Sequence, residues 1–282
     1  MSVEIIQQRL AAYACRSTTE EEQALREISQ EIILAALGRT NFFSFAGFHG
    51  GTCLRIFHGL NRFSEDLDFA LRSPDDRFQL MPYLQQVRED LKAFGYAIEV
   101  EDRSARGQAV RKAFLKDQSL GSLLELAYQP RSGPMRKLRI KLEVDTNPPA
   151  GATYASLVLD YPFPSAVSVF DLPSLFAGKI HALLCRDYLK GRDWYDFIWY
   201  TARHTAINHA LLSAALNQQG PWAGSAPSTD TTWCINALCA RIDTIDWQKA
   251  AQDVTRFLKP IEIPSLALWS RDFFLSQCRK LS

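Results

Sequence analysis

Two short stretches decide the fold of this chain: Gly50-Gly51-Thr52 and Arg62-Phe63-Ser64-Glu65-Asp66-Leu67-Asp68-Phe69-Ala70-Leu71. The second stretch is typical of the start of a strand. Side chains alternate along a strand, so Asp66 and Asp68 point to one face and the apolar residues beside them point to the core. Two carboxylates so close repel each other, and a cation between them relieves that repulsion. The pattern therefore predicts a cation site on a strand, with a solvated, charged turn as the alternative.

A pair of carboxylates suits Mg²⁺, or Mn²⁺, because such an ion takes its remaining oxygen ligands from water and from substrate phosphates. The glycine turn formed by Gly50 and Gly51 precedes the strand and offers backbone N–H groups to a phosphate. Together, the turn and the acids predict a site for a nucleoside triphosphate and a divalent metal ion.

Composition narrows the class of protein. The chain has 282 residues, of which 47% are hydrophobic and 22% charged, as is typical of a globular protein. The formal net charge of +1 means that a nucleic-acid partner would need a local basic patch. The sequence contains no run of about 18 apolar residues, so no membrane span is predicted. The N-terminal residues lack the pattern of a signal peptide. We therefore expect a cytoplasmic protein.

The cysteines are scattered and form no C-x-x-C motif, which favours buried apolar roles over a disulfide or a zinc site. They are Cys15, Cys53, Cys185, Cys234, Cys239 and Cys278.

The first part of the chain mixes helix and strand patterns. Helices are predicted over 3–15, 20–37 and 76–94, with helical turns over 53–58, and strands over 42–46, 67–71, 98–100, 123–127 and 139–145. Thr18 or Thr19 is expected to cap the second helix. In the last of these strands Ile140, Leu142 and Val144 share one face, opposite a charged one.

The later part is predicted to be helical, over 172–186, 193–203, 207–218, 233–242, 247–258 and 265–279. We therefore expect an α/β (α+β) lobe with a mixed sheet over residues 1–165. An all-helical lobe over 166–282 follows, with a cleft between the two.

The ordered motifs resemble the AbiEii (MenT-like) family of toxin nucleotidyltransferases, within the DNA polymerase β-type nucleotidyltransferase superfamily. The resemblance covers about half the chain. It lies in the glycine turn with Leu54, Arg62-x-Ser64-x-Asp66-x-Asp68, Ile140–Glu143, Lys179–Arg186, and Arg192-Asp193-x-x-Asp196. It implies a nucleotidyltransferase fold and transfer of a nucleoside monophosphate from an NTP.

The resemblance also implies roles for the residues of the first lobe. Asp66 and Asp68 would hold Mg²⁺ on the β- and γ-phosphates, while Gly50, Gly51, Thr52 and Ser64 would contact the nucleotide. Ser64 fits an ordinary turn residue equally well. Glu143 would be the third metal ligand, with Asp145 on the same face as its competitor. A salt bridge from Glu143 to Lys141 is the structural alternative.

In the second lobe, the resemblance implies that Lys179 reaches into the cleft to bind phosphate, with Arg186 on the same helical face. Alternatively, Lys179 extends to the surface. Asp193 or Asp196 would hold Lys179 or the ribose, and we favour Asp196 as the catalytic member of the pair. Both acids also suit the first turn of a helix, where they complement the dipole.

The expected partners are an NTP, which the glycine turn and the acids predict, and a tRNA acceptor and a cognate antitoxin, which follow from the resemblance. Three groups of basic residues could supply an RNA surface, although solvated faces are the alternative. They are Arg103, Arg106, Arg111, Lys112 and Lys116; Arg131, Arg136, Lys137, Arg139 and Lys141; and Arg186, Lys190 and Arg192. A protein or small-molecule acceptor, or a non-catalytic nucleotide-binding module, remains open.

Overall fold

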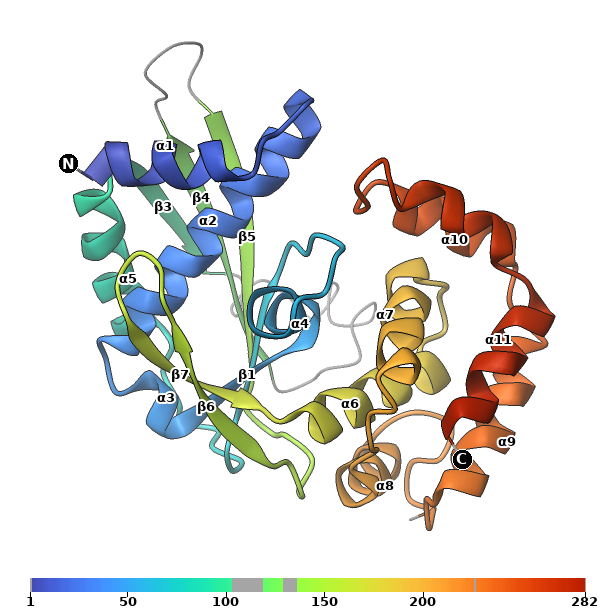
Figure 1. Cartoon of the computed structure of the whole chain (residues 1–282). Helices are drawn as coiled ribbons and strands as arrows, with labels where there is room; N and C mark the ends of the chain where they lie inside the picture. The colour runs from blue at the N-terminus through green and yellow to red at the C-terminus, as the bar shows by residue number, and fades with distance from the viewer. Residues whose placement is uncertain (1, 103–118, 129–135, 226, 282) are drawn as a thin grey trace. The chain divides into compact units, whose positions relative to one another are not determined.

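The computed structural model describes residues 2–102, 119–128, 136–225 and 227–281 (Figure 1). The chain divides into two compact units. Unit 1 comprises Met1–His58, Phe63–Pro148 and Ala155–Val169, and unit 2 comprises Gly59–Arg62, Pro149–Tyr154 and Phe170–Ser282. Unit 2 thus includes a four-residue segment that precedes Ser64 and the two strand acids in the sequence.

Unit 1 is built on a mixed sheet. The described residues form seven strands in the order β3-β4-β5-β2-β1-β7-β6. β2 runs antiparallel to β1 and parallel to β5, and β7 runs parallel to β1. The mixed sheet predicted from the sequence is therefore confirmed. The strands are β1 (Ala46–His49), β2 (Leu67–Leu71), β3 (Tyr96–Asp102), β4 (Ser119–Tyr128), β5 (Arg136–Asp145), β6 (Tyr154–Leu159) and β7 (Ser165–Phe170).

Two long helices cover one face of this sheet. α2 (Thr18–Gly38) and α5 (Met81–Ala93) pack against each other and against β5 and β3, respectively (Figure 1). α1 (Ser2–Ala12) packs on α2. The short helices α3 (Phe42–Phe45) and α4 (Gly50–His58) flank β1. Alternating apolar residues of β5 and β2 fill the core beneath the helices.

Several predicted elements of unit 1 need correction. Residues 42–45 form helix α3 rather than a strand, and Phe42 packs its ring edge-on against Phe69. α2 is capped by Ser17, whose hydroxyl accepts from the Glu20 N–H, rather than by Thr18 or Thr19. α5 begins at Met81 instead of residue 76, with a proline in its first turn. Strands β6 and β7 were not predicted.

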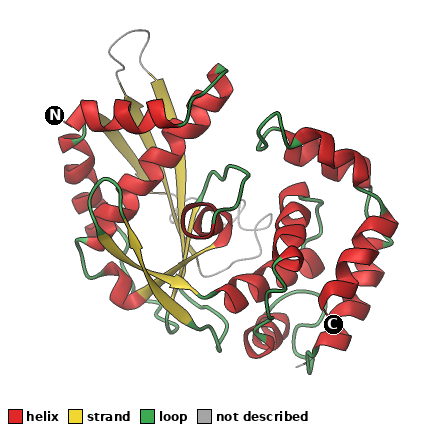
Figure 2. Ribbon diagram, viewed as in Figure 1, coloured by secondary structure: helices red, strands yellow, loops and turns green. Residues whose placement is uncertain are grey.

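Unit 2 is helical except for its two short segments, Gly59–Arg62 and Pro149–Tyr154 (Figure 2). An aromatic cluster holds its helices together, with the rings of Trp247 and Phe274 stacked at 4.0 Å and Trp194 edge-on to both. Its helices are α6 (Leu172–Cys185), α7 (Gly191–Ala202), α8 (His209–Gln218), α9 (Thr231–Ile242), α10 (Trp247–Thr255) and α11 (Arg271–Cys278), with 3₁₀ turns at Ile263–Leu268 and Arg279–Leu281.

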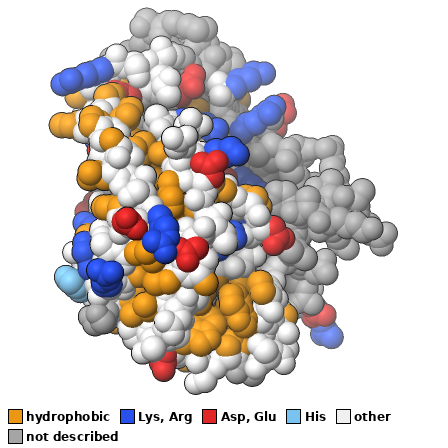
Figure 3. Space-filling view, turned by 90° about the vertical axis from the view of Figure 1, so that its right-hand side faces the viewer, with side chains coloured by type: hydrophobic (Ala, Val, Ile, Leu, Met, Phe, Trp, Pro, Cys, Tyr) orange, Lys and Arg blue, Asp and Glu red, His pale blue; other side chains and the backbone are white. Residues whose placement is uncertain are grey.

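The predicted helix over 265–279 is therefore wrong in its first part. The 3₁₀ segment ends at Leu268, and Ser270 caps α11 by accepting from the Phe273 N–H. None of the six cysteines, all of which lie in the described ranges, forms a disulfide. Within the described ranges, no helix is both long and apolar enough to cross a membrane. Figure 3 shows basic and acidic side chains interspersed on the face it presents.

Candidate functional site

The predicted acids of unit 1 lie where β2 begins. Asp66 immediately precedes the strand and Asp68 is its second residue. Leu67 and Phe69 are buried, whereas both aspartates are half-buried, as the alternation predicts. In the sheet, Asp68 is aligned with His49 on β1 and with Glu143 on β5. The row of polar residues thus crosses three neighbouring strands.

The glycine turn and the acids are in direct contact. Gly50 has a positive φ of 80°, which favours glycine, and a Cβ on it would stand 2.6 Å from Asp68 Oδ2. Two residues on, the Thr52 hydroxyl donates a hydrogen bond to the backbone carbonyl of Asp66. Thr52 is fully buried, so this hydrogen bond fixes the backbone where the strand begins. Gly51, between them, forms part of the first turn of α4.

The other predicted residues of unit 1 have local partners. Glu143 Oε1 lies 2.5 Å from Lys141 Nζ, which is the salt bridge considered as the structural alternative. The Asp145 carboxylate accepts from the Asn147 N–H at 3.1 Å. The Ser64 carbonyl accepts from Gln30 Nε2 at 3.2 Å. Among the described residues, no group of three or more His, Cys, Asp or Glu side chains is placed to hold a metal ion.

The donor set at β2 nevertheless fits a small divalent ion. Asp66 and Asp68 are partly exposed and offer hard oxygen ligands. Mg²⁺ commonly uses only one or two carboxylates and completes its shell with water and phosphate oxygens. Two acids locked to a glycine turn are therefore sufficient as the protein's share of such a site.

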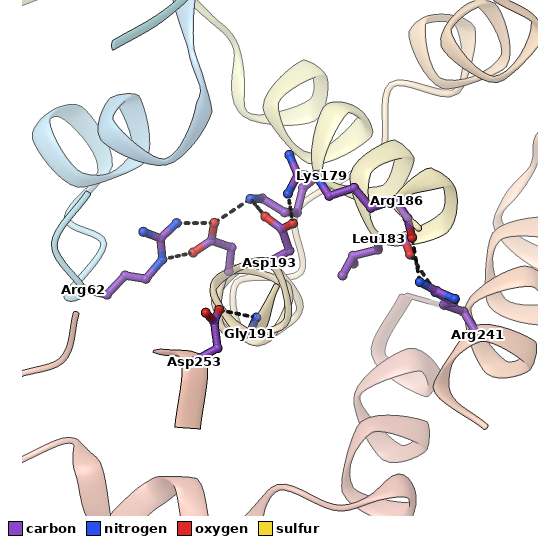
Figure 4. A network of polar contacts seen from close by, with 9 residues as sticks. Arg62, Lys179, Leu183, Arg186, Gly191, Asp193, Arg241 and Asp253 are labelled. Carbon is purple, nitrogen blue, oxygen red and sulfur yellow. Dashed lines mark hydrogen bonds and ion pairs between the residues drawn. The ribbon is translucent and has the colours of Figure 1, made fainter. Parts of the chain in front are cut away.

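A second group of predicted residues meets inside unit 2 (Figure 4). The first turn of α6 is capped by Asp171, and the helix carries Lys179. Lys179 Nζ lies 2.6 Å from Asp193 Oδ1 and 2.7 Å from Asp196 Oδ2, both on α7. Asp193 and Asp196 are three residues apart and so face the same side of the helix. Both aspartates hold the lysine, whereas the sequence predicted one.

Each aspartate also has an arginine partner. Arg62 donates two hydrogen bonds of 2.6 Å to the two carboxylate oxygens of Asp196. Arg186 Nη1 pairs with Asp193. The Arg62 side chain is only 3% exposed and that of Asp196 is fully buried. Three cations thus surround two anions, and the cluster carries one excess positive charge.

These cations keep both aspartates ionised. Burial alone would raise the pKa of Asp193, but Lys179 and Arg186 hold that pKa well below its usual range. Burial likewise opposes ionisation of Asp196, and Arg62 and Lys179 lower its pKa despite it. The two carboxylates therefore hold Lys179 in place rather than exchange protons near neutral pH.

Arg62 is the residue that sequence reasoning missed. Arg62 is the first residue of the motif that contains the strand acids, but the motif predicts no role for it. Its partner is 134 residues away in the chain, so no local pattern could predict the pair. The sequence offered one indirect signal. Arg62 lies close to the predicted site at Asp66, and the chain has two acids at helical spacing elsewhere that an arginine could pair with.

Two solved structures share this fold. One is a crystal structure from H. pylori described as a candidate nucleotidyltransferase, with 16% identity, a TM-score of 0.53, and coverage of 91% of this chain and 94% of that one. The other is JHP933 from Helicobacter pylori, with 16% identity, a TM-score of 0.54, and coverage of 93% and 94%. No curated protein matches the chain.

The family comparison covers most of the chain. Residues 32–277 match the model of a family described as nucleotidyl transferase AbiEii toxin, type IV TA system. Membership makes the protein a nucleotidyltransferase and implies an NTP substrate and an antitoxin partner. The chain therefore belongs to the AbiEii family of nucleotidyltransferase toxins, as the motifs around Asp66 and Lys179 predicted.

Proposed function

We propose that this toxin transfers a nucleoside monophosphate from an NTP to the 3′ end of an RNA, with tRNA as the acceptor. Growth would then stop because the modified tRNA cannot serve in translation, within a toxin–antitoxin or phage-defence setting. The observation that carries the proposal is the contact of the glycine turn with Asp66 and Asp68 in a chain of nucleotidyltransferase family.

Asp66 and Asp68 are the residues that would hold Mg²⁺ or Mn²⁺. The bound ion would neutralise charge on the leaving pyrophosphate. The chain's own contribution is to keep the two carboxylates in place. Thr52 fixes the Asp66 backbone, and Gly50 leaves room for the Asp68 carboxylate. Glu143 is the candidate for a third ligand only if it leaves Lys141 when substrate binds.

The unit 2 cluster supplies phosphate recognition in this proposal. Because Arg62 and Arg186 offset the charges of Asp196 and Asp193, the Lys179 ammonium remains as the excess charge. The Lys179 side chain is 11% exposed, so its ammonium is held nearly dry. A point charge fixed in this way suits a phosphate group. Asp193 and Asp196 act on the reaction by positioning Lys179.

Transfer can be tested with purified protein, Mg²⁺, each α-³²P-labelled NTP and total tRNA on a denaturing gel. We expect label in a tRNA band, and loss of that label in Asp66→Ala with an unchanged melting temperature. Glu65→Ala is the matched control, because Glu65 is the neighbouring acid, precedes the strand and lies 3.8 Å from Arg26.

A fully active Asp66→Ala protein would contradict the assignment of the site. Label on a protein or on a small molecule, with none on RNA, would replace tRNA by another acceptor class. Nucleotide binding without pyrophosphate release would indicate a non-catalytic binding module.

A further inference from the structure

The connection between α6 and α7, residues 186–190, is held firmly at both ends (Figure 4). At its start, Arg241 Nη2 donates to the Arg186 carbonyl at 2.7 Å, and Arg241 Nε donates to the Leu183 carbonyl at 3.3 Å. At its end, the Gly191 N–H donates to Asp253 Oδ2 at 2.8 Å. The connection is therefore fixed to helices α9 and α10.

Close packing reinforces the second anchor. A Cβ on Gly191 would stand 1.9 Å from the Ala250 carbonyl oxygen, so α10 lies directly against the backbone of α7 there. Only glycine allows this approach. A connection anchored in this way presents its side chains in a fixed geometry, which lowers the entropy lost when a ligand binds.

Between the anchors stands an exposed aromatic ring. Tyr188 is 55% exposed, although large apolar and aromatic side chains usually find cover. The Arg186 guanidinium lies 5.6 Å from the centroid of the Tyr188 ring. The same guanidinium is tied to Asp193. The ring thus has a cation beside it and open surface for a second planar group.

The connection that carries this ring has two basic residues, Arg186 and Lys190, against one acid, the exposed Asp187. The strongest charged influences on Lys190 are one anion, Asp193, and three cations, Arg186, Arg192 and Lys179. Burial lowers the pKa of the Lys190 ammonium to about 8; Asp193 opposes this shift, and the three cations add to it. Lys190 is therefore a half-buried cation among like charges, an arrangement that an added anion relieves.

An aromatic face beside excess positive charge matches a ligand that carries both a planar ring and a phosphate. We propose that Tyr188, Arg186 and Lys190 form a subsite for an unpaired nucleotide, whose base stacks on Tyr188 while its phosphate lies near the cations. The inference deepens the proposed function, on which it rests, by assigning a base-recognition residue. The nucleotide could belong to a single-stranded RNA end or to a free NTP.

Binding to the full chain separates these sources. The RNA probe is a fluorescein-labelled single-stranded oligoribonucleotide ending in CCA, measured by anisotropy with EDTA so that no transfer occurs. A second probe has the same backbone but abasic residues in place of the last three nucleotides. The third measurement is calorimetric binding of each NTP with Mg²⁺.

The variants are Tyr188→Ala, Tyr188→Phe and the control Phe45→Ala. Phe45 is an aromatic residue of similar exposure, 48%, on α3 of unit 1. Because Tyr188 is exposed, Tyr188→Ala should melt at the wild-type temperature. We expect Tyr188→Ala to weaken binding of the intact RNA by about 5- to 100-fold, as is typical for loss of one stacked base. Tyr188→Phe and Phe45→Ala should bind like the wild type.

With the abasic probe, wild type and Tyr188→Ala should bind equally, because no base remains to stack. If Tyr188→Ala weakens only NTP binding, the subsite takes the donor nucleotide. Equal losses for the intact and abasic probes, or no loss with RNA and NTP alike, would overturn the inference.

The outcome is distinguishable from failure of the proposed function. Asp66→Ala should bind the RNA normally while losing transfer. If Asp66→Ala retained transfer but Tyr188→Ala lost base-dependent binding, the catalytic assignment would fail and the subsite would stand.

Discussion

The two pairs of aspartates in this molecule have the same chemistry and opposite surroundings. Asp66 and Asp68 lie at the start of a strand in unit 1, half-buried, against a glycine turn. Asp193 and Asp196 lie on a helix in unit 2, buried among Arg62, Lys179 and Arg186. The spacing in the sequence is two residues in one case and three in the other.

The surroundings determine what each pair can do. A buried carboxylate needs a paired cation, and once paired it has little capacity for another ligand. The strand acids keep partial exposure, so the water around them can give way to a metal ion, which would in turn bind phosphates. We therefore propose that the strand pair binds the metal ion and that the helix pair positions a lysine.

The largest expected effect is on transfer by the strand pair. Asp66→Ala or Asp68→Ala should lower the rate by about a thousandfold or more, because metal stabilisation of the transition state is worth several kcal/mol. The free energy of unfolding should stay within about 0.5 kcal/mol of wild type, since the acids are partly exposed. Single-turnover kinetics and urea unfolding measure the two quantities. A large loss of unfolding free energy in Asp66→Ala or Asp68→Ala would show that the strand acids, like the helix pair, have a structural role.

The next effect is on the stability of unit 2. Arg62→Ala should lower the free energy of unfolding by about 3–5 kcal/mol, because it leaves the buried Asp196 carboxylate without its arginine. The matched control is Arg271→Ala. Arg271 Nε lies 2.6 Å from Asp243 Oδ1, but both side chains are more than half exposed. That solvent-exposed pair should contribute far less to stability than the buried one.

Arg62→Leu combined with Asp196→Asn should regain part of the stability lost in Arg62→Ala, because it removes the buried carboxylate that Arg62→Ala leaves with Lys179 alone. Equal losses for Arg62→Ala and Arg271→Ala in urea unfolding would show that burial does not set the strength of the Arg62 pair.

A smaller effect is expected in the pH dependence of stability. The pKa of Asp193 is lowered in the folded state, so its contribution is fully present above the unfolded value of about 3.9. The contribution is lost as pH falls below that value toward the folded pKa. Between pH 5 and about pH 2 the wild type should therefore lose more stability than Asp193→Asn, measured by urea unfolding at each pH. Parallel curves would contradict the role given to Lys179 and Arg186.

The smallest effect concerns the contact that fixes Asp66. Thr52→Val keeps the shape of the buried side chain but removes the hydroxyl that donates to the Asp66 carbonyl. We expect a loss of about 1 kcal/mol in unfolding free energy. The control is Cys53→Ser, because Cys53 is an equally buried neighbour. Thr52→Val should lower the rate of transfer by more than Cys53→Ser does. Unchanged transfer in Thr52→Val would show that Asp66 keeps its position without this bond.

The sequence predicted the elements whose pattern is local. Alternation marked β2 and β5, and helical patterns marked most of the helices of unit 2. The prediction failed at residues 42–45, because a short, mostly apolar run is found both in buried strands and in short helices. β6 was missed because its exposed Val158, 63% accessible, blurs the alternation.

The candidate site shows the same division. Asp66 and Asp68 could be predicted as a pair because they lie two residues apart in the sequence. The ion pair of Arg62 with Asp196 and the hydrogen bond of Arg241 to the Arg186 carbonyl could not, since each joins residues far apart in the chain. The basic residues at 103–116 and Arg131, predicted as part of an RNA surface, lie outside the described residues, and their role stays a prediction.

The most direct test of the contrast between the two pairs is Mn²⁺ binding measured by electron paramagnetic resonance, with a non-hydrolysable NTP analogue present. We expect one bound ion in the wild type, loss of that ion in Asp66→Asn, and retention of it in Asp193→Asn. Retention in Asp66→Asn together with loss in Asp193→Asn would place the metal ion on the helix pair and rule out the strand pair as its site.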